Sequence, residues 1–221
     1  MNFYESVNMN EHEQIFRRLW EQVCDIHYTW QMYCDLYAVS PDVIKLLNQN
    51  GSGFFRVNQL LMLDYVALSL SKLTDPGATS KNKNLSLKQL IKHAEKERDT
   101  DLLAQLTEAF GKVELACEGF KKIRNKRIAH SDLKHALNEA EKALPGITQA
   151  AVEQALKQVR EFMNIYEEYH TNCTTAYDCV HAPYGTGSDA LVESLKRKIH
   201  NKLFKRDSQR VVFLPCVGFS V

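Results

Sequence analysis

The sequence is poor in the residues that interrupt regular structure, with only 9 glycines and 5 prolines among 221 residues. So few turn residues exclude a many-stranded sandwich or barrel. No stretch approaches the roughly 18 consecutive apolar residues of a membrane span. The first residues, MNFYESVNMNEHEQ, lack the basic-then-apolar layout of a signal peptide. We therefore expect a mostly helical protein of the cytoplasm that makes no membrane contact.

The six cysteines form no CxxC pair and lie mostly within helical patterns, as reduced structural thiols do. We therefore expect no disulfide. Two close pairs, His170 with Cys173 and Cys179 with His181, have the residue types of zinc ligands. The spacing between the two cysteines is atypical of zinc sites, so we expect no metal and no cofactor.

Charge is balanced overall but uneven along the chain. The 28 basic and 27 acidic residues give a net charge of +1, yet residues 76–135 carry 13 basic against 8 acidic side chains. Residues 1–75 carry 5 against 9. Such blocks can steer an anionic ligand to one face, or let an acidic face of one subunit meet a basic face of another. A solvated helix surface is the alternative.

Apolar residues recur every three or four positions along most of the chain, which predicts amphipathic helices. We expect helices over residues 11–38, 41–51, 54–73, 85–97, 100–123, 134–144, 148–170 and 188–203. The expected N-terminal caps are Ser40, Thr100, Thr148 and Ser188, and the expected breaks are Gly51 and Asp75-Pro76-Gly77. Residues 77–84 have turn composition and are expected to form a mobile surface loop.

Two parts follow from this pattern. Residues 1–170 are expected to form an all-α helical bundle, and residues 171–221 a C-terminal appendage with one basic helix and an apolar tail. The tail, VVFLPCVGF at 211–219, has no helical period. It could pair as a strand or dock in a groove.

The most informative string is KKIRNKRIAHSD at 121–132, which has five cations in seven residues and a histidine close behind them. Histidine can transfer protons near neutral pH, and the arginine fork matches phosphate oxygens. In RNA the internal nucleophile is the 2′-hydroxyl, so a base, a proton donor and a cation suffice for cleavage without a metal. The string therefore favours an anionic substrate such as RNA. Lys121, Lys122 and Lys126 are its candidate RNA-binding residues.

Helix geometry leaves the pairing within this string open. Arg124 and His130 are six residues apart, which places them roughly 240° apart around an ideal helix. Either the helix distorts near Ala129, or each residue acts with its counterpart from a second subunit. Arg127 and His130 share a face and form the rival pair. Basic residues and a histidine near a helix C-terminus can also simply stabilise its carbonyl groups.

Two acidic residues have plain structural explanations. Asp64 is expected to be a surface carboxylate, and Asp75 a residue of the turn that ends a helix. An acidic group near the cleft could, however, orient His130.

The string RNKRIAH at 124–130 resembles the signature of HEPN domains, an arginine and a polar residue followed four to six residues later by a histidine. Other strings resemble the abortive-infection, AbiU-like branch of that family: LSLSKLTDP at 68–76, KNKNLSL at 81–87 and LPGIT at 144–148. The resemblance covers roughly residues 10–170 and depends on these strings in combination.

The resemblance implies an all-α, HEPN-like bundle that dimerises with its two Arg/His motifs facing each other across a composite cleft. The HEPN family includes metal-independent endoribonucleases that act in phage defence and as toxins. Carried over to this chain, the catalytic residues are Arg124 and His130, supported by Asn125 and Arg127. An antitoxin or regulatory protein is a possible partner. One branch is regulated by modification of a tyrosine two places after the histidine, but residue 132 here is Asp132, so that regulation is not expected.

Two functions remain open at this stage. The first is a homodimeric endoribonuclease that needs no metal. The second is a non-catalytic binding module of the same fold, which uses the basic string to hold RNA, a nucleotide or a partner protein.

Overall fold

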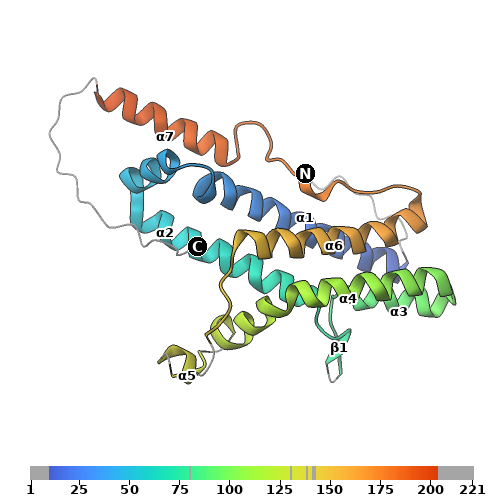
Figure 1. The fold of residues 1–221 in the computed structure, drawn as a ribbon. Coiled ribbons are helices and arrows are strands. Elements are labelled where there is room, and N and C mark those ends of the chain that lie inside the picture. Colours follow the sequence, from blue (N-terminus) through green and yellow to red (C-terminus); the bar gives the residue numbers. More distant parts are fainter. Residues whose placement is uncertain (1–9, 80, 130, 138, 141–142, 204–221) are drawn as a thin grey trace.

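The computed structural model describes residues 10–203 except residues 80, 130, 138 and 141–142 (Figure 1). Over these residues the chain is all-α apart from one short hairpin, which confirms the expected fold class. The elements are α1 (Glu11–Tyr33), the π-helical turn η1 (Cys34–Ala38), α2 (Pro41–Leu73), β1 (Ala78–Thr79), β2 (Asn82–Lys83), α3 (Lys88–Glu97), α4 (Thr100–Ile123), the π-helical turn η2 (Arg124–Ile128), α5 (Leu133–Ala136), α6 (Gln149–Thr171), the 3-10 turn η3 (Tyr177–Cys179) and α7 (Ser188–Leu203).

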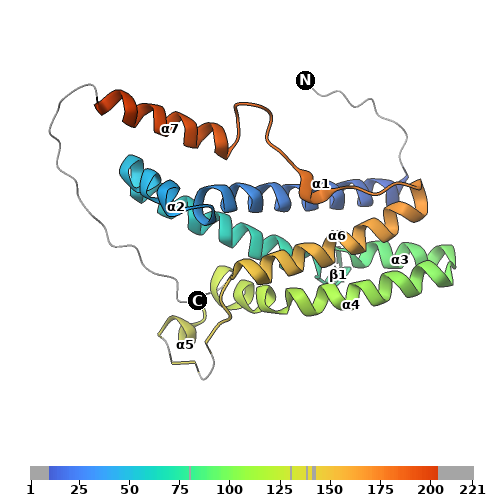
Figure 2. The ribbon, with the colours of Figure 1, turned by 45° about the horizontal axis from the view of Figure 1, so that its top comes forward.

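Five helices build the main bundle. Helices α4 and α6 lie side by side, α3 packs along α4, and α1 and α2 cover the other side (Figures 1 and 2). One continuous apolar core joins them, and Leu19, Leu70, Val113 and Phe162 are completely buried in it. Tyr177 of η3 is buried in the same core. Burial of this contiguous apolar surface is the main source of stability for the bundle.

Helix α7 packs separately, against η1 and the first part of α2 (Figure 2). A small second apolar cluster joins these elements through Leu36, Leu46, Leu47, Phe55 and Val192. Ser188 was expected to cap α7, but it is already the first helical residue, and its hydroxyl donates to Asp35 Oδ2 at 2.6 Å. That bond ties α7 to η1. The apolar tail at 211–219 lies outside the described residues.

Helix α2 contains the predicted break as a kink. Gly51 has φ 153° and ψ 59°, while helical geometry resumes on both sides of it. Glycine adopts this conformation at little cost because it lacks a Cβ. The two helices expected over 41–51 and 54–73 are therefore two arms of one kinked element.

The predicted caps are partly confirmed. The side chains of Ser40 and Thr148 accept backbone N–H groups at the starts of α2 and α6. The prediction for Thr100 was wrong, because Asp99 Oδ1 accepts the Leu102 N–H at 2.7 Å and Thr100 is already helical. An ionised carboxylate at this position also interacts favourably with the helix dipole.

Two further expectations need correction. The helix expected over 134–144 is only the single turn α5, Leu133–Ala136. The segment 77–84 is a short antiparallel hairpin, in which Ala78 pairs with Lys83. It is anchored, because the Gln89 amide donates to the Gly77 carbonyl at 2.6 Å and Lys83 Nζ lies 2.8 Å from Glu11 Oε1.

Within the described ranges, no helix combines the length and the apolar character that crossing a membrane requires. Five of the six cysteines fall in these ranges, and all five are free thiols. Burial raises the pKa of Cys117 to about 12, so this thiol stays protonated and unreactive.

Candidate active site at the end of helix α4

Helix α4 changes its hydrogen-bonding pattern where the basic string begins. The α-helical pattern ends at Ile123, and residues Arg124–Ile128 continue as the π-helical turn η2. The Ala129 N–H donates to the Arg124 carbonyl, which is five residues earlier, at 2.8 Å. π-Helical turns are rare in proteins, and those that occur often lie at functional sites. The helix is therefore distorted across the motif, which was one of the two alternatives left open by the angle between Arg124 and His130.

Arg124 is held from two sides. Its Nη1 donates to both carboxylate oxygens of Asp75, at 2.7 and 2.9 Å, and its Nε donates to Asn125 Oδ1 at 3.1 Å. The side chains of Arg124 and Asp75 are 23% and 24% exposed. A charge-assisted pair that is mostly shielded from water is stronger than an exposed one. The guanidinium is therefore fixed in place, and the side chain remains partly exposed.

The role of Asp75 was missed in the sequence. Asp75 does follow the end of α2, as expected, and its N–H bonds to the Lys72 carbonyl at 3.1 Å. Its carboxylate, however, reaches a partner 49 residues later in the chain. Spacing along the sequence cannot predict such a contact, because it depends on how α2 packs against η2.

Arg127, the rival to Arg124, has its own carboxylate. Its Nη2 donates to Asp64 of α2. This pair is more open, with side chains that are 50% and 41% exposed. Asp64 is thus a surface carboxylate, as expected, but one that joins η2 to α2. The two motif arginines therefore differ in environment: Arg124 is enclosed and Arg127 faces solvent.

The segment after the motif is organised by Asp132. Its carboxylate accepts from Lys126 Nζ at 2.7 Å, from the His135 backbone N–H at 3.3 Å, and lies 2.7 Å from His135 Nδ1. These bonds, that of Lys126 first, hold the pKa of Asp132 well below its usual range. Asp132 also caps α5. His135 was not among the predicted site residues; an aspartate at a helix N-cap was the only available signal, and it predicts the cap and not the contact with an imidazole.

Lys121 and Lys122, the other two cations of the string, are also paired. Lys121 Nζ lies 3.6 Å from Glu114 Oε1, and Lys122 Nζ lies 2.7 Å from Glu118 Oε1. Each of the five cations between 121 and 127 thus has a carboxylate partner. The string is therefore not the bare positive patch that the sequence suggested. The exposed pairs among them are worth only about 0–1 kcal/mol each, so they hold their cations weakly.

His130, the predicted proton-transfer residue, lies outside the described residues. In the chain it comes two residues after the end of η2 at Ile128, and the Asp132 N–H, two residues later again, bonds back to the Lys126 carbonyl at 3.1 Å. The backbone on both sides of His130 is therefore tied to η2.

Metal-ligating side chains gather elsewhere. In the described part of the chain, one group of three such residues lies close enough to share an ion: His93, Glu97 and His170. Neither Cys173 nor Cys179 belongs to this group. The His170/Cys173 and Cys179/His181 pairs therefore do not come together as one metal site among the described residues.

A known protein family matches most of the chain. A model of the HEPN family AbiU2 matches residues 9–191, which include the motif and extend into α7. No curated protein and no solved structure matches the chain. The matched region contains the whole main bundle, the distorted end of α4 and the Arg124–Asp75 pair. The chain therefore belongs to the AbiU2 family and is a HEPN protein of the abortive-infection type.

Proposed function

We propose that this protein is a homodimeric endoribonuclease that cleaves RNA without a metal ion, using Arg124 and His130 at a cleft shared by two subunits. The observation that carries this proposal is the fixation of Arg124 by Asp75 and Asn125 at a π-helical turn that ends two residues before His130 in the chain. A guanidinium that is already oriented needs no rearrangement when charge develops on a phosphate.

The proposed reaction uses the 2′-hydroxyl of the substrate. His130 takes the 2′-hydroxyl proton, and the 2′-oxygen attacks the adjacent phosphorus. Arg124 stabilises the negative charge of the phosphorane. The bond to the 5′-oxygen then breaks, and that oxygen receives a proton from His130 of the partner subunit. The products are a 2′,3′-cyclic phosphate and a 5′-hydroxyl, so protons and charge balance without a metal.

An exposed apolar stripe on α2 supports the dimer. Phe54, Val57, Leu61 and Tyr65 follow one another at helical spacing, and all four are exposed, from 40% for Tyr65 to 70% for Phe54. Asp64, which pairs with Arg127, borders the stripe. Exposed apolar side chains gathered on one face of a helix favour an interaction surface there. A two-fold contact through it would bring the motifs of both subunits to the same side of the assembly.

The decisive experiment is cleavage of total RNA by the purified protein in excess EDTA, with the new ends mapped. We expect cleavage to persist and to leave 2′,3′-cyclic phosphate or 3′-phosphate ends with 5′-hydroxyls. Obligatory Mg²⁺, or 3′-hydroxyl ends, would contradict the mechanism.

Single substitutions identify the residues. His130→Ala is expected to reduce cleavage by about 10²–10⁴ with little loss of RNA affinity, because it removes proton transfer and not a fixed charge. Arg124→Ala is expected to reduce the cleavage rate by about 10²–10³-fold and to lower the affinity for RNA. Lys121→Ala and Lys122→Ala should mainly change the salt dependence of binding.

Arg127→Ala is the matched control, since it also breaks an ion pair between an arginine of η2 and an aspartate, here Asp64 of α2. If Arg127→Ala were inactive and Arg124→Ala active, with both variants folded, the catalytic arginine would be misassigned. If the wild-type protein bound RNA without cutting it, the binding-module function would replace the enzyme.

A further inference from the structure

A second cluster of functional side chains lies at the opposite end of helix α4 from Arg124. Helix α3 ends there at Glu97, α4 begins at Thr100, and α6 ends at Thr171 (Figure 1). The 24 residues of α4 separate the two ends by about 36 Å. A ligand at this end would therefore lie far from the proposed RNA site.

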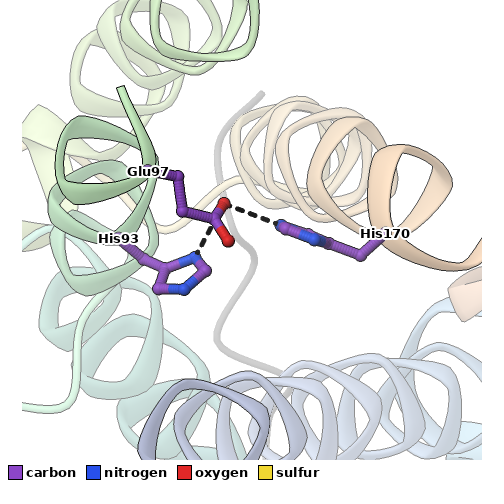
Figure 3. A group of neighbouring side chains, drawn as sticks. All are labelled: His93, Glu97 and His170. Atoms are coloured by element: carbon purple, nitrogen blue, oxygen red, sulfur yellow. Dashed lines mark ion pairs between the residues drawn. The ribbon is translucent and has the colours of Figure 1, made fainter. Parts of the chain in front are cut away.

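Three ligand-type residues converge at this end. His93 and Glu97 lie one turn apart on α3, and His170 reaches them from the last turn of α6. Figure 3 shows the Glu97 carboxylate between the two imidazole rings. Glu97 Oε2 lies 3.5 Å from His93 Nδ1 and 4.0 Å from His170 Nε2. Two ligands bonded at about 2.0–2.1 Å to one tetrahedral zinc ion are themselves about 3.3–3.4 Å apart, so small side-chain movements would close the site.

Tyr166 is another close polar neighbour of His93. Its hydroxyl lies 3.1 Å from His93 Nδ1. An acceptor imidazole nitrogen has one lone pair, so an ion bound at Nδ1 would replace the contact with Tyr166. The ligand atoms of His93, Glu97 and His170 lie within 4.8 Å of one another, so one cation between them would have all three within reach.

The surroundings add negative potential and a further imidazole. The C-terminal ends of α3 and α6, where the helix dipole is negative, both point into this region. The ring of His12, at the start of α1, stacks on His93 with centroids 3.8 Å apart. Three of the eight histidines in the chain thus meet here. His12 and His170 also line a hollow of about 460 Å³ between α1 and α6, which gives an ion a route from solvent.

We propose that His93, Glu97 and His170 form a zinc-binding site that clamps the end of α3 to the end of α6. Two imidazole nitrogens and one carboxylate oxygen are a ligand set that zinc uses, with a fourth position left for water or another ligand. The ion would join helices that are far apart in sequence, so its binding energy would add to the stability of the fold.

The test is zinc binding by the full-length protein after treatment with EDTA and removal of the chelator, measured by calorimetry and by Co²⁺ absorption. We expect one ion per chain, visible-range Co²⁺ bands typical of tetrahedral nitrogen and oxygen ligation, and a rise in melting temperature on zinc addition. His170→Ala and Glu97→Gln are expected to weaken affinity more than the 10–100-fold typical of losing an indirect partner. Glu97→Gln keeps the size of the side chain, so it reports on ligation even if His170→Ala unfolds.

His181→Ala and Cys179→Ser are the matched controls, because they remove ligand-type side chains outside the cluster. Both are expected to bind zinc like the wild type. The proposal is overturned if the wild-type protein binds no stoichiometric zinc, or if the controls lose zinc while His170→Ala and Glu97→Gln keep it. RNA cleavage in EDTA does not enter this test, so failure here and failure of the proposed endoribonuclease are distinguishable.

Discussion

Arg124 is bonded to Asp75 and Asn125 in the folded chain, and its proposed partner in the reaction is a phosphate of the RNA. The Asp75 carboxylate fixes the guanidinium through Nη1 and neutralises it in the free protein. A phosphate then competes with that carboxylate or binds the remaining edge of the guanidinium. Asp75 is therefore a positioning residue, since it would act on the substrate only through Arg124.

We predict that Asp75→Asn lowers kcat for RNA cleavage by about 10–100-fold and leaves KM unchanged or lower. The guanidinium loses its orientation, and a small misplacement at a reacting centre is costly. The affinity for RNA does not fall, because the substitution removes a negative charge near the phosphate. Steady-state kinetics on a defined oligonucleotide measure both constants.

Asp64→Asn is the control for this prediction, because it breaks the Arg127 pair in the same region. It is expected to leave kcat within about threefold of the wild type, since Arg127 is not the proposed catalytic arginine and exposed pairs contribute little. Equal losses of kcat in both variants would mean that Asp75 acts on the packing of η2 and not on Arg124.

At the scale of elements, a helix is predictable from the sequence where apolar periodicity and turn residues agree. The helices α1, α4 and α6 and the kink at Gly51 follow from such patterns. The change from α- to π-helical bonding at Arg124 does not, because the residue types in η2 are equally compatible with both. The hairpin at 78–83 was missed because turn-rich composition alone does not distinguish a free loop from one anchored by Gln89 and Lys83.

The kink in α2 permits a paired test of backbone conformation. Gly51→Ala is expected to destabilise the protein by about 1–3 kcal/mol, because its φ of 153° is strained for any residue with a Cβ. Gly53→Ala is expected to stabilise by about 0.5–1 kcal/mol, because a Cβ there meets nothing within 4 Å and alanine favours helix. Urea unfolding of both variants measures the two signs. A stabilising Gly51→Ala would show that the kink is not held by the bundle.

For the whole molecule, one buried histidine sets a pH dependence of stability. His27 is 6% exposed and packs against Tyr177 in the main core. Its Nε2 has no hydrogen-bond partner within the described residues. Burial first, and the charge of Arg160 second, lower its pKa to about 4. In the unfolded chain a histidine takes up its proton near pH 6.5, so acid favours unfolding.

We therefore predict that His27 stabilises the fold in full only above about pH 6.5, and that this contribution is lost as the pH falls towards 4. This difference in pKa between the folded and unfolded chain lowers the free energy of unfolding by about 2–3 kcal/mol at pH 4.5. Urea unfolding at pH 7 and pH 4.5 should show a smaller acid-induced loss in His27→Leu than in the wild type. Identical losses in the two proteins would mean that His27 is already protonated in the native state or solvated.

The proposed cleavage needs the motifs of two chains, and we expect these chains to associate through the exposed apolar stripe of α2. Leu61→Asp places a charge in the middle of the exposed stripe, where burial against a second subunit would cost several kcal/mol. We predict that it converts the dimer to a monomer in light scattering at micromolar concentration and abolishes cleavage, with an unchanged melting curve. Leu115→Asp, on the exposed side of α4 at 77% exposure, is the control and should remain dimeric and active.

A wild-type protein that is monomeric yet active would contradict the composite site. One chain would then have to supply both proton-transfer groups. His135, which lies beside Asp132, is the histidine next to His130 in the sequence and would be the first candidate for the second group.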